Sequence, residues 1–502
     1  MRTTYAAAAL LSLSILWGCT TTESQEKADL IILQMNDVYE IAPLEGGKVG
    51  GLARVATLKQ QLESEAPVIT ILSGDFLSPS LTGTLEYEGK KIAGRQMVES
   101  LNALGLDYVT FGNHEFDLKE PDLLARIDES DFTWISTNTF HVTHGDTLPF
   151  TQKGAPLPRS VVHSIPLGED TLRLAFIGIC LPFTLKPFVY YNTEYRQVVS
   201  QELAKLNDQP HIPLAITHLN IADDERFAQN NPEFPLIMGG HDHDSMRVAV
   251  NDSYIIKADA NAKSVAVHRL WYQEDGTVEI KTDIIPITNQ LAEEPEVLAV
   301  INKWQGIADA AMLKMGYNPT EVLIHTDSVL DGRESIIRNE PSYLGTLTCD
   351  AMLYADTSFT DLAVFNSGSI RLDDQIEGTV TMYDVLRTYP YGGPIKRTTM
   401  TGADLQIVLN NGRANKGSGG YLQTTQVQYT GSTYLIRGDT LEPDKEYSLF
   451  VTDYMSGGKE SNLEILKDFT YQYDTATVFR NATKNDLRDV VASYMKYLES
   501  EK

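Results

Sequence analysis

Residues 108–117 read YVTFGNHEFD, a short apolar run rich in β-forming residues that ends abruptly in polar side chains. The same pattern recurs along the first half of the chain. The other runs are LIILQM before Asn36-Asp37, VITILS before Gly74-Asp75, IPLAIT before His218, and FPLIM before Gly239-Gly240-His241. Each run predicts a buried strand.

Segments with helical spacing lie between these predicted strands. GLARVATLKQQLESE (51–65) and GRQMVESLNALG (94–105) both carry apolar residues at the intervals of one helix face. Strands that alternate with helices predict an α/β layered fold. Ligands of such sheets bind beyond the carboxyl ends of the strands, and here each of those ends carries Asp, Asn or His. We therefore expect a ligand site at that edge.

The length and composition indicate more than one globular domain. A chain of 502 residues is too long for a single compact core, and 42% hydrophobic with 22% charged residues is typical of folded proteins. Residues 291–316 have a helical period that ends at a glycine, which predicts a linker helix. We expect a first α/β domain over 29–290, a smaller one over 317–480, and a C-terminal helix over 481–502.

The N-terminus has the pattern of a processing signal. Residues 1–19 contain Arg2 and an apolar run too short to span a bilayer, and Leu16-Trp17-Gly18-Cys19 resembles a bacterial lipobox with a lipid-modified Cys19. Because Trp17 is bulky for that position, an ordinary signal peptide is the alternative. Residues 20–28 predict a polar tether. We expect a location in the cell envelope on the periplasmic side, as an outer-membrane lipoprotein or otherwise secreted.

Charge and cysteine content exclude some partners and linkages. The formal net charge of −27, from 41 Lys+Arg against 68 Asp+Glu, opposes binding to a nucleic-acid polymer. A small phosphate ester is compatible with it, because bound divalent cations reverse the local field of an acidic cleft. Cys180 and Cys349 fall in different predicted domains and in apolar strings, so we expect buried thiols and no disulfide.

The side chains at the predicted strand ends form a set with metal-binding chemistry. The set comprises Asp37, Asp75, Asn113, His114, His218, His241 and His243. Carboxylate, amide and imidazole together suit two adjacent divalent ions such as Zn, Mn, Fe or Co. Such a pair, about 4 Å apart, can clamp the attacking and leaving oxygens of a phosphoryl group. Taken singly, each residue is better explained as a helix cap or a core histidine.

The ordered fragments GD, GNHEFD, TH and GGHDH resemble the metallophosphoesterase superfamily, and GGLARVATLKQQL resembles its 5′-nucleotidase and UDP-sugar hydrolase branch. The resemblance implies two mixed sheets flanked by helices, followed by a smaller α/β domain of the 5′-nucleotidase C-terminal type. It implies that Asp75 bridges two metals, with Asp37 and His243 on the first and Asn113, His218 and His241 on the second. His114 would face the substrate phosphate and Asp117 would orient its imidazole.

One fragment departs from this family pattern. The family usually has Asp-x-His at the first fragment, whereas this chain has Asp37-Val38-Tyr39. Tyr39 either coordinates as a phenolate, which favours a ferric or similarly strong Lewis acid, or packs aside and leaves the first site weaker. The second outcome is slightly favoured.

The second half of the chain carries fragments that resemble the family's substrate-binding domain. RNEPSYLGTLTCDAM and FNSGSIR imply that Arg338 and Arg371 contact phosphate or ribose and that Asn366 contacts the base. Tyr391 and Tyr454 fall on or near the two aromatic positions that sandwich a base. In isolation these would be surface residues and an ordinary turn.

A loop near the end of this domain also departs from the family. The family loop reads GGDG with a ribose-binding Asp, whereas this chain has Gly457-Gly458-Lys459-Glu460. A cation at that position weakens a contact to the ribose hydroxyls and favours a negatively charged group. A substrate with more phosphate or without ribose is therefore an alternative. The metal-binding set and the resemblance together predict two-metal hydrolysis of a nucleoside 5′-monophosphate or related nucleotide, releasing phosphate.

Several alternatives to this function remain. The same chemistry could act on a nucleotide sugar, a 2′,3′-cyclic nucleotide or a sulfur ester. Tyr39 and Lys459 also motivate a non-catalytic envelope lipoprotein that binds nucleotides, and a purely structural lipoprotein would bind no metal. The resemblance further implies a large rotation between the two domains, which the linker helix permits.

Overall fold

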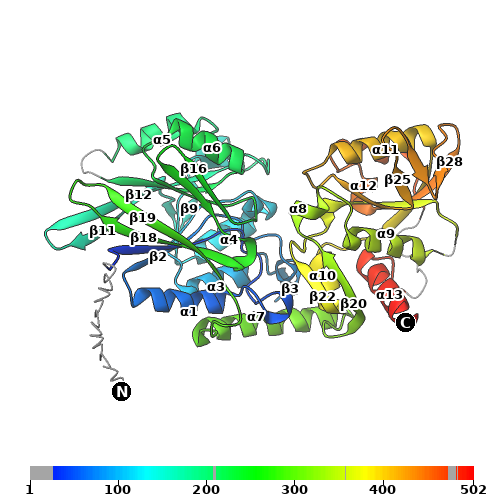
Figure 1. The fold of residues 1–502 in the computed structure, drawn as a ribbon, viewed down its shortest axis with the longest axis horizontal. Helices are drawn as coiled ribbons and strands as arrows, with labels where there is room; N and C mark the ends of the chain where they lie inside the picture. The colour runs from blue at the N-terminus through cyan, green and yellow to red at the C-terminus, as the bar shows by residue number, and fades with distance from the viewer. Residues whose placement is uncertain (1–26, 207–210, 357, 473–481, 483) are drawn as a thin grey trace, which may run out of the picture.

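The structure is a computed structural model that describes residues 27–206, 211–356, 358–472, 482 and 484–502. The predicted signal segment, Cys19 and most of the tether lie outside the described residues. No helix in the described part of the chain is long and apolar enough to cross a membrane. The chain forms two bodies side by side, with the N-terminal half in one and the C-terminal half in the other (Figure 1).

The first body contains a six-stranded sheet in the order β19-β18-β1-β2-β5-β6. Its strands are β1 (Leu30–Met35), β2 (Val68–Leu72), β5 (Tyr108–Val109), β6 (Thr133–Trp134), β18 (Ser264–Tyr272) and β19 (Val278–Pro286). β1, β2, β5 and β6 are parallel, and β18 and β19 are antiparallel additions. The carboxyl ends of the parallel strands therefore meet at one edge.

A second six-stranded sheet has the order β11-β12-β14-β15-β17-β16. Its strands are β11 (Ser160–Leu167), β12 (Asp170–Cys180), β14 (Ile212–His218), β15 (Leu236–Gly239), β16 (Met246–Val250) and β17 (Ser253–Lys257). β12, β14, β15 and β17 are parallel. The five strands predicted from the apolar runs are all present, and the predicted α/β layered fold is confirmed.

The two sheets pack face to face with helices outside them (Figure 1). Successive residues of β1 point to opposite faces: Leu30 and Ile32 join the core between the sheets, whereas Ile31 and Leu33 join the core beneath the helices. The helices on that side are α1 (Leu52–Glu63), α3 (Arg95–Leu104) and α4 (Glu120–Glu129). Those on the second sheet are α5 (Tyr195–Ala204) and α6 (Ile221–Asn230). Full burial explains why the parallel strands read as unbroken apolar runs.

Buried polar side chains join the two sheets near the edge that carries the functional residues. The Gln34 amide donates to the carbonyl oxygens of Gly239 (3.1 Å) and Ile256 (3.0 Å). The Gln34 side-chain oxygen in turn accepts from His268 Nε2 at 2.9 Å. Asn36 pairs with both backbone groups of Ala258. Because an unpaired buried amide costs about 1–3 kcal/mol, these bonds fix how the sheet edges face each other.

The linker helix predicted over 291–316 is α7 (Pro295–Lys314). Pro295 occupies its first turn and Glu294 caps it by accepting from Val297 N at 2.8 Å. The helix packs against α1 and α3 through the fully buried Trp304, whose indole donates to Glu99 at 3.0 Å. Figure 1 shows α7 running along the lower side of the first body towards the second.

The second body is built on a four-stranded sheet in the order β23-β28-β21-β24. Its strands are β21 (Leu362–Asn366), β23 (Ile395–Thr401), β24 (Leu422–Thr425) and β28 (Glu446–Thr452). α9 (Tyr343–Ala355) and α13 (Leu487–Ser500) cover one face, and α11 (Gly402–Ala414) covers the other. α13 lies within the predicted C-terminal helix. Cys180 and Cys349 are both buried, one in each body, and are not bonded to each other, as predicted.

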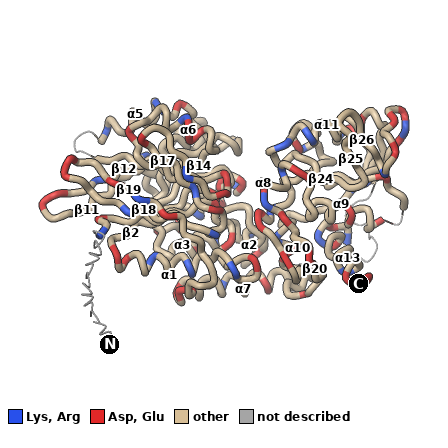
Figure 2. The backbone as a smooth tube through the Cα atoms, viewed as in Figure 1, with Lys and Arg blue, Asp and Glu red and all other residues tan. Residues whose placement is uncertain are grey.

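Further elements complete both bodies. Those of the first body are α2 (Leu81–Thr84), β3 (Glu86–Tyr87), β4 (Lys90–Lys91), β7 (Thr139–Thr143), β8 (Asp146–Leu148), β9 (Thr151–Gln152), β10 (Ala155–Pro156) and β13 (Val189–Tyr191). Those of the second are β20 (Val322–Asp331), α8 (Glu334–Ile337), β22 (Gln375–Thr381), α10 (Met382–Thr388), β25 (Val427–Tyr429), β26 (Tyr434–Ile436), β27 (Asp439–Thr440) and α12 (Asp453–Ser456). Basic residues flank α8, on the side that faces the first body (Figure 2).

Candidate metal centre and substrate cavity

The two carboxylates at the sheet edge sit on sharply turned backbone. Asp37 follows β1 with φ 53° and Asp75 follows β2 with φ 57°, and both side chains are fully buried. Left-handed backbone at non-glycine residues costs about 1–3 kcal/mol and is typical of functional sites. The neighbouring Gly112 leaves the space for this turn, because a Cβ there would lie 2.1 Å from Asp75 Oδ1.

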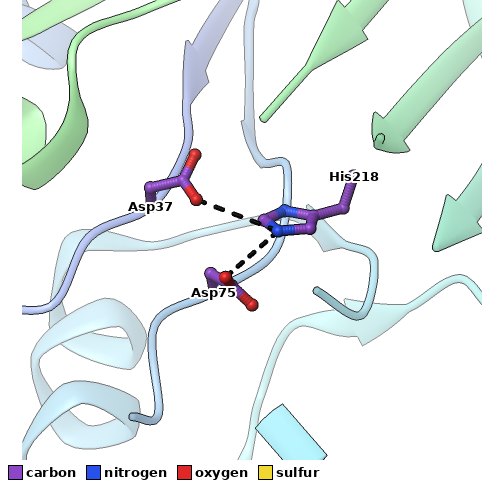
Figure 3. Close-up of side chains that lie close together, drawn as sticks. All are labelled: Asp37, Asp75 and His218. Carbon is purple, nitrogen blue, oxygen red and sulfur yellow. Dashed lines mark ion pairs between the residues drawn. The ribbon is translucent and has the colours of Figure 1, made fainter. Parts of the chain in front are cut away.

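Asp37, Asp75 and His218 converge on one point (Figure 3). One ligand atom from each lies within 4.8 Å of the others. His218 Nε2 is 3.1 Å from Asp75 Oδ2 and 3.9 Å from Asp37 Oδ1. His218 Nδ1 lies 2.7 Å from the carbonyl oxygen of Ser73, to which it donates, and this turns Nε2 towards the carboxylates.

The chemistry of this cluster fits a divalent cation. Asp37 Oδ1 and His218 Nε2 are buried and have no hydrogen-bond partner among the described residues. Burial opposes the charged imidazolium, but Asp75 and Asp37 outweigh it and raise the pKa of His218 to about 9. The pocket between these atoms therefore attracts positive charge, which a metal ion supplies with two or more ligand bonds.

Asn113 and His241 lie beside this cluster. His241 Nδ1 is 3.1 Å from Asn113 Oδ1, and the His241 backbone N–H donates to Asp37 Oδ2 at 2.9 Å. Burial, and then the neighbouring His218, lower the pKa of His241 to about 3. Its imidazole is thus neutral at physiological pH, which is the state that binds a metal.

Tyr39 and His243 close the other side of the cluster. The Tyr39 hydroxyl lies 3.2 Å from both Asp75 Oδ2 and His243 Nε2, and His243 Nε2 lies 3.4 Å from Asp37 Oδ1. Of the two alternatives for Tyr39, the structure has the side chain turned into the cluster. The physical reason lies in the loop, because Asn261 Oδ1 accepts from the backbone N–H of Tyr39 at 3.0 Å and holds it turned inward. The side chain is only 7% exposed.

His114 and Asp117 form the predicted pair. They lie at the two ends of the 3₁₀ turn His114–Asp117, and His114 Nδ1 is 2.7 Å from Asp117 Oδ2. The backbone N–H of His114 also donates to Asp75 Oδ1 at 2.7 Å. Burial works against protonation, yet Asp75 and Asp117 raise the pKa of His114 above its ordinary value. The site thus favours the protonated form of this imidazole.

Glu115 is a site residue that sequence reasoning missed. Its fully buried carboxylate accepts from the backbone N–H groups of Gly112 (2.6 Å), Asp75 (2.9 Å), Phe76 (2.8 Å) and Leu77 (3.2 Å). Burial, and then Asp75, raise the pKa of Glu115 to about 7 against these donors. Glu115 ties the loops after β2 and β5 together. The only signal in the sequence was a charged residue inside GNHEFD.

Lys257 was missed as well. Its fully buried ammonium donates to the carbonyl oxygens of Leu219 (2.6 Å) and Gly240 (2.7 Å) and pairs with Asp242 (2.5 Å) and Asp224 (2.7 Å). A buried charge needs such partners. Here they fix the loop that carries His241 and His243.

A cavity of about 630 Å³ lies between the two bodies, directly above the cluster. Its lining from the first body includes Asp75, Asn113, His114, His241 and His243. Its lining from the second body includes all the predicted residues there: Arg338, Asn366, Arg371, Tyr391 and Tyr454. The fold therefore brings both predicted groups to one cavity, with Asp37 and His218 buried beneath it.

The two arginines of the cavity have unused donors. Nε of Arg338 and Nε of Arg371 are buried and lack a hydrogen-bond partner among the described residues. Arg338 pairs with Glu334, and the Arg371 guanidinium lies 5.9 Å from the centre of the Tyr391 ring. Guanidinium groups with spare donors in a cavity suit an oxyanion.

The far wall of the cavity is aromatic and amide-containing. Tyr391 and Tyr454 are 55% and 42% exposed, which is unusual for large rings and leaves their faces open to a ligand. The Tyr454 hydroxyl donates to the Lys459 carbonyl oxygen at 3.0 Å. Asn366 is buried, accepts from Ser369 Oγ at 2.9 Å and donates to Glu460 Oε2 at 2.8 Å.

The loop at Gly457-Gly458-Lys459-Glu460 differs from the expectation for Lys459. Lys459 is absent from the cavity lining, whereas Glu460, 9% exposed, lines it. The backbone turns at Gly458 with φ 64°, so the carboxylate two residues later faces inward. The cavity is therefore lined by an acceptor, Glu460, and not by the cation that the sequence led us to expect.

Comparison with known proteins agrees with this geometry. Residues 30–245 match the calcineurin-like phosphoesterase family, and residues 322–468 match the C-terminal domain of 5′-nucleotidase. Human 5′-nucleotidase is 24% identical, with 94% of this chain and 90% of that protein aligned. A trifunctional nucleotide phosphoesterase of Bacillus subtilis is 26% identical over 80% of this chain, but this chain spans only 29% of its length.

A solved structure shares the fold along nearly the whole chain. It is the 5′-nucleotidase precursor from Thermus thermophilus, with a TM-score of 0.74, 20% identity, and 94% of this chain and 96% of that one covered. The match to that structure shows the fold and extends over both halves of this chain. The chain therefore carries a calcineurin-like phosphoesterase domain followed by a 5′-nucleotidase C-terminal domain.

Proposed function

We propose that this protein hydrolyses the phosphate ester of a nucleoside 5′-monophosphate or a closely related nucleotide with the help of two divalent metal ions. The observation that carries the proposal is a single cavity with two distinct walls. One wall holds the buried carboxylates and imidazoles, and the other holds guanidinium groups and open tyrosine rings. A nucleotide has a phosphate for the first wall and a base for the second.

The residues that would hold the metals follow the expected set. Asp75 would be shared, Asp37 and His243 would serve the first ion together with Tyr39, and the second ion would be held by Asn113, His218 and His241. Bound Zn, Mn, Fe or Co lowers the pKa of a water molecule and neutralises charge on a phosphoryl group. The inward Tyr39 hydroxyl favours a strong Lewis acid in the first site.

The protein's own groups would act on the substrate as follows. Arg338 and Arg371 would bind non-bridging phosphate oxygens and hold the phosphorus in line with an attacking water oxygen. As the bond from phosphorus to the ester oxygen breaks, the protonated His114 would give its proton to the departing alkoxide. Asp117 would hold the imidazole in that orientation through the 2.7 Å contact at Nδ1.

Specificity would come from the second body. Stacking of a base between Tyr391 and Tyr454 contributes about 1–3 kcal/mol by analogy with single-strand binding platforms. The Glu460 carboxylate would accept hydrogen bonds from ribose hydroxyls, and Asn366 would reach the base edge. Because Glu460 rather than Lys459 faces the cavity, a ribose substrate suits this wall better than a more highly charged one.

A substrate panel tests this proposal. Phosphate release would be measured with AMP, UDP-glucose, a 2′,3′-cyclic nucleotide and an aryl phosphate, before and after chelation and after metal is restored. We expect turnover of AMP that chelation abolishes. Activity confined to UDP-glucose or the cyclic nucleotide would move the assignment to those esters. Metal-loaded protein that binds AMP without releasing phosphate from any ester would replace the enzyme with a binding protein.

We also propose the domain division and location expected from the sequence. The division is 29–290, a linker over 291–316, and 317–480, with a C-terminal helix over 481–502. Export with a lipid on Cys19 would attach the chain to the outer membrane on its periplasmic side. Mass spectrometry of the mature N-terminus tests this, since a diacylated Cys19 supports the anchor and an unmodified terminus after cleavage elsewhere refutes it.

A further inference from the structure

We propose that Asp373, in the second domain, is a positioning residue for His243 in the first domain, so that full affinity at the first metal site requires the domain arrangement seen here. The inference rests on the proposed function, because it concerns one of the two proposed metal sites. It arises from a contact that crosses the domain interface directly beside the cluster.

The contact itself is short and shielded. Asp373 Oδ2 lies 2.6 Å from His243 Nδ1, and the two side chains are only 13% and 12% exposed. Asp373 follows the FNSGSIR fragment and has left-handed backbone with φ 41°. A charged pair that is close and screened from water fixes its members more firmly than a surface pair does.

Asp373 is held in place from both domains. Its other carboxylate oxygen, Oδ1, accepts from the backbone N–H of Glu334 at 3.0 Å, within the second domain. Its carbonyl oxygen lies 3.4 Å from Nζ of Lys263, which belongs to the first domain. The carboxylate is therefore presented to the imidazole in one orientation.

The effect on His243 follows from the two ring nitrogens. With Nδ1–H donated to Asp373, the lone pair of Nε2 faces the cluster, 3.2 Å from the Tyr39 hydroxyl and 3.4 Å from Asp37 Oδ1. A carboxylate behind a ligating imidazole fixes its tautomer and makes it a stronger ligand. Loss of such a partner typically lowers metal affinity by about 10- to 100-fold.

The other two histidines proposed to bind metal, His218 and His241, are oriented within the first domain. His218 Nδ1 contacts the Ser73 carbonyl oxygen, and His241 Nδ1 contacts Asn113. In the described part of the chain, His243 is thus the cluster histidine whose contact at Nδ1 comes from the second domain. A domain movement that withdraws Asp373 would weaken the first site and leave the second intact. By linkage, metal in the first site would favour the domain arrangement in which Asp373 is docked.

Metal titration of the full-length protein tests the inference. Metal-depleted wild type and Asp373→Asn would be titrated with Mn²⁺ and followed by calorimetry and by the EPR signal of unbound Mn²⁺. We expect one of two ions to bind about 10- to 100-fold more weakly in the variant, with the other unchanged. Asp327→Asn, an exposed carboxylate on β20 of the same domain, is the matched control and should bind both ions normally. Asp373→Glu should recover part of the loss.

Hydrogen exchange of the wild type supplies a test that needs no variant. Mn²⁺ should slow amide exchange in residues 371–375 of the second domain, but not in β25–β27 on its far side. Equal Mn²⁺ affinities in wild type and Asp373→Asn, or exchange at 371–375 that ignores the metal, would overturn the inference while leaving the phosphoesterase intact. Wild type that binds no Mn²⁺ at all would instead refute the proposed metal centre.

Discussion

The metal cluster and the substrate wall face the same cavity but are built from different kinds of backbone. The cluster residues lie at the carboxyl ends of parallel strands, and the carboxylates are completely buried. The substrate wall, which is the part of the cavity lined by the second domain, lies mainly on loops, and its tyrosines are about half exposed. A strand end fixes where the next side chain goes, whereas a loop can shift its side chains by one residue without disturbing the core.

Because of this difference, we expect the substrate wall to tolerate amino-acid substitutions better than the metal cluster does. A polar group removed from the buried cluster leaves its partners unpaired in a place that water does not reach. A residue removed from the loop wall leaves a surface that water can refill. We therefore expect substitutions in the cluster to abolish chemistry and substitutions in the wall to alter substrate preference.

The largest expected effect is that of Asp75→Asn. The substitution removes a negative charge from the point where His218 and Tyr39 converge, so it weakens both proposed metal sites at once. A loss of about 5 kcal/mol of charge stabilisation corresponds to about a 10⁴-fold fall in kcat/KM. Bound metal per chain, measured by elemental analysis, should fall in parallel.

Asp170→Asn, an exposed carboxylate at the start of β12, is the control for Asp75→Asn and should leave activity and metal content unchanged. If Asp75→Asn kept both ions and most of its activity, the strand-end cluster would not be the catalytic centre. The contrast between the two regions would then lose its basis.

His114→Ala should give the next largest effect, about 10²- to 10⁴-fold in kcat. The metal content should not change, because His114 is proposed to meet the substrate and not the ions. The loss should be large for AMP, whose alkoxide leaving group needs a proton, and small for an aryl phosphate with an acidic phenol. Equal losses for the two esters would contradict the role as proton donor. His144→Ala, in an exposed turn, is the control.

The sequence predicted most in the region where backbone freedom is least. The apolar runs predicted the strands, and the residues that follow them predicted that Asp37, Asp75 and His218 lie together. The prediction was possible because ligand-binding residues follow the carboxyl ends of parallel strands. The sequence left two orientations open for Tyr39, since the Asn261 bonds that turn its loop inward come from far along the chain. Glu115 was missed because its partners are backbone N–H groups, which leave no pattern in the sequence.

The second domain shows the opposite balance. Its arginines and tyrosines were predicted from resemblance and do line the cavity, but the side chain expected from the family loop was misplaced by one residue. Because the backbone turns at Gly458, the side chain of Glu460 lines the cavity and that of Lys459 does not. The spacing of residues in the sequence does not reveal this turn. Asp373 lay next to a quoted fragment, yet its role depends on how the two domains dock.

Glu460→Gln and Lys459→Ala sharpen the comparison within one loop. Glu460→Gln should raise KM for AMP about tenfold, because a charged acceptor to the ribose contributes about 1.5–3 kcal/mol and the amide retains part of it. KM for an aryl phosphate, which has no ribose, should not change. Lys459→Ala should change neither value. A larger effect from Lys459→Ala would mean that the loop turns differently when substrate binds.

The smallest effect expected concerns the framework behind the cluster and appears in stability. Burial, and then Arg247, lower the pKa of His268 to about 3, and its ring bonds Gln34 and Thr282 Oγ1 in the neutral form. The unfolded chain has a histidine pKa of about 6.5, so below that pH the unfolded state binds a proton that the folded state does not. Stability is then lost as the pH falls from about 6.5 towards 3, by up to about 1.4 kcal/mol per pH unit.

Urea unfolding of metal-free wild type and His268→Gln at several pH values isolates this histidine, because the cluster residues titrate equally in both proteins. The free energy of unfolding of the wild type should fall more steeply than that of the variant as the pH is lowered from about 6 to about 4. Parallel curves would show that His268 accepts its proton without loss of the Gln34 bond. The bond from His268 that holds Gln34, whose amide in turn joins the two sheets, would then be adaptable. The placement of the strand-end cluster would then depend less on a rigid frame than its burial indicates.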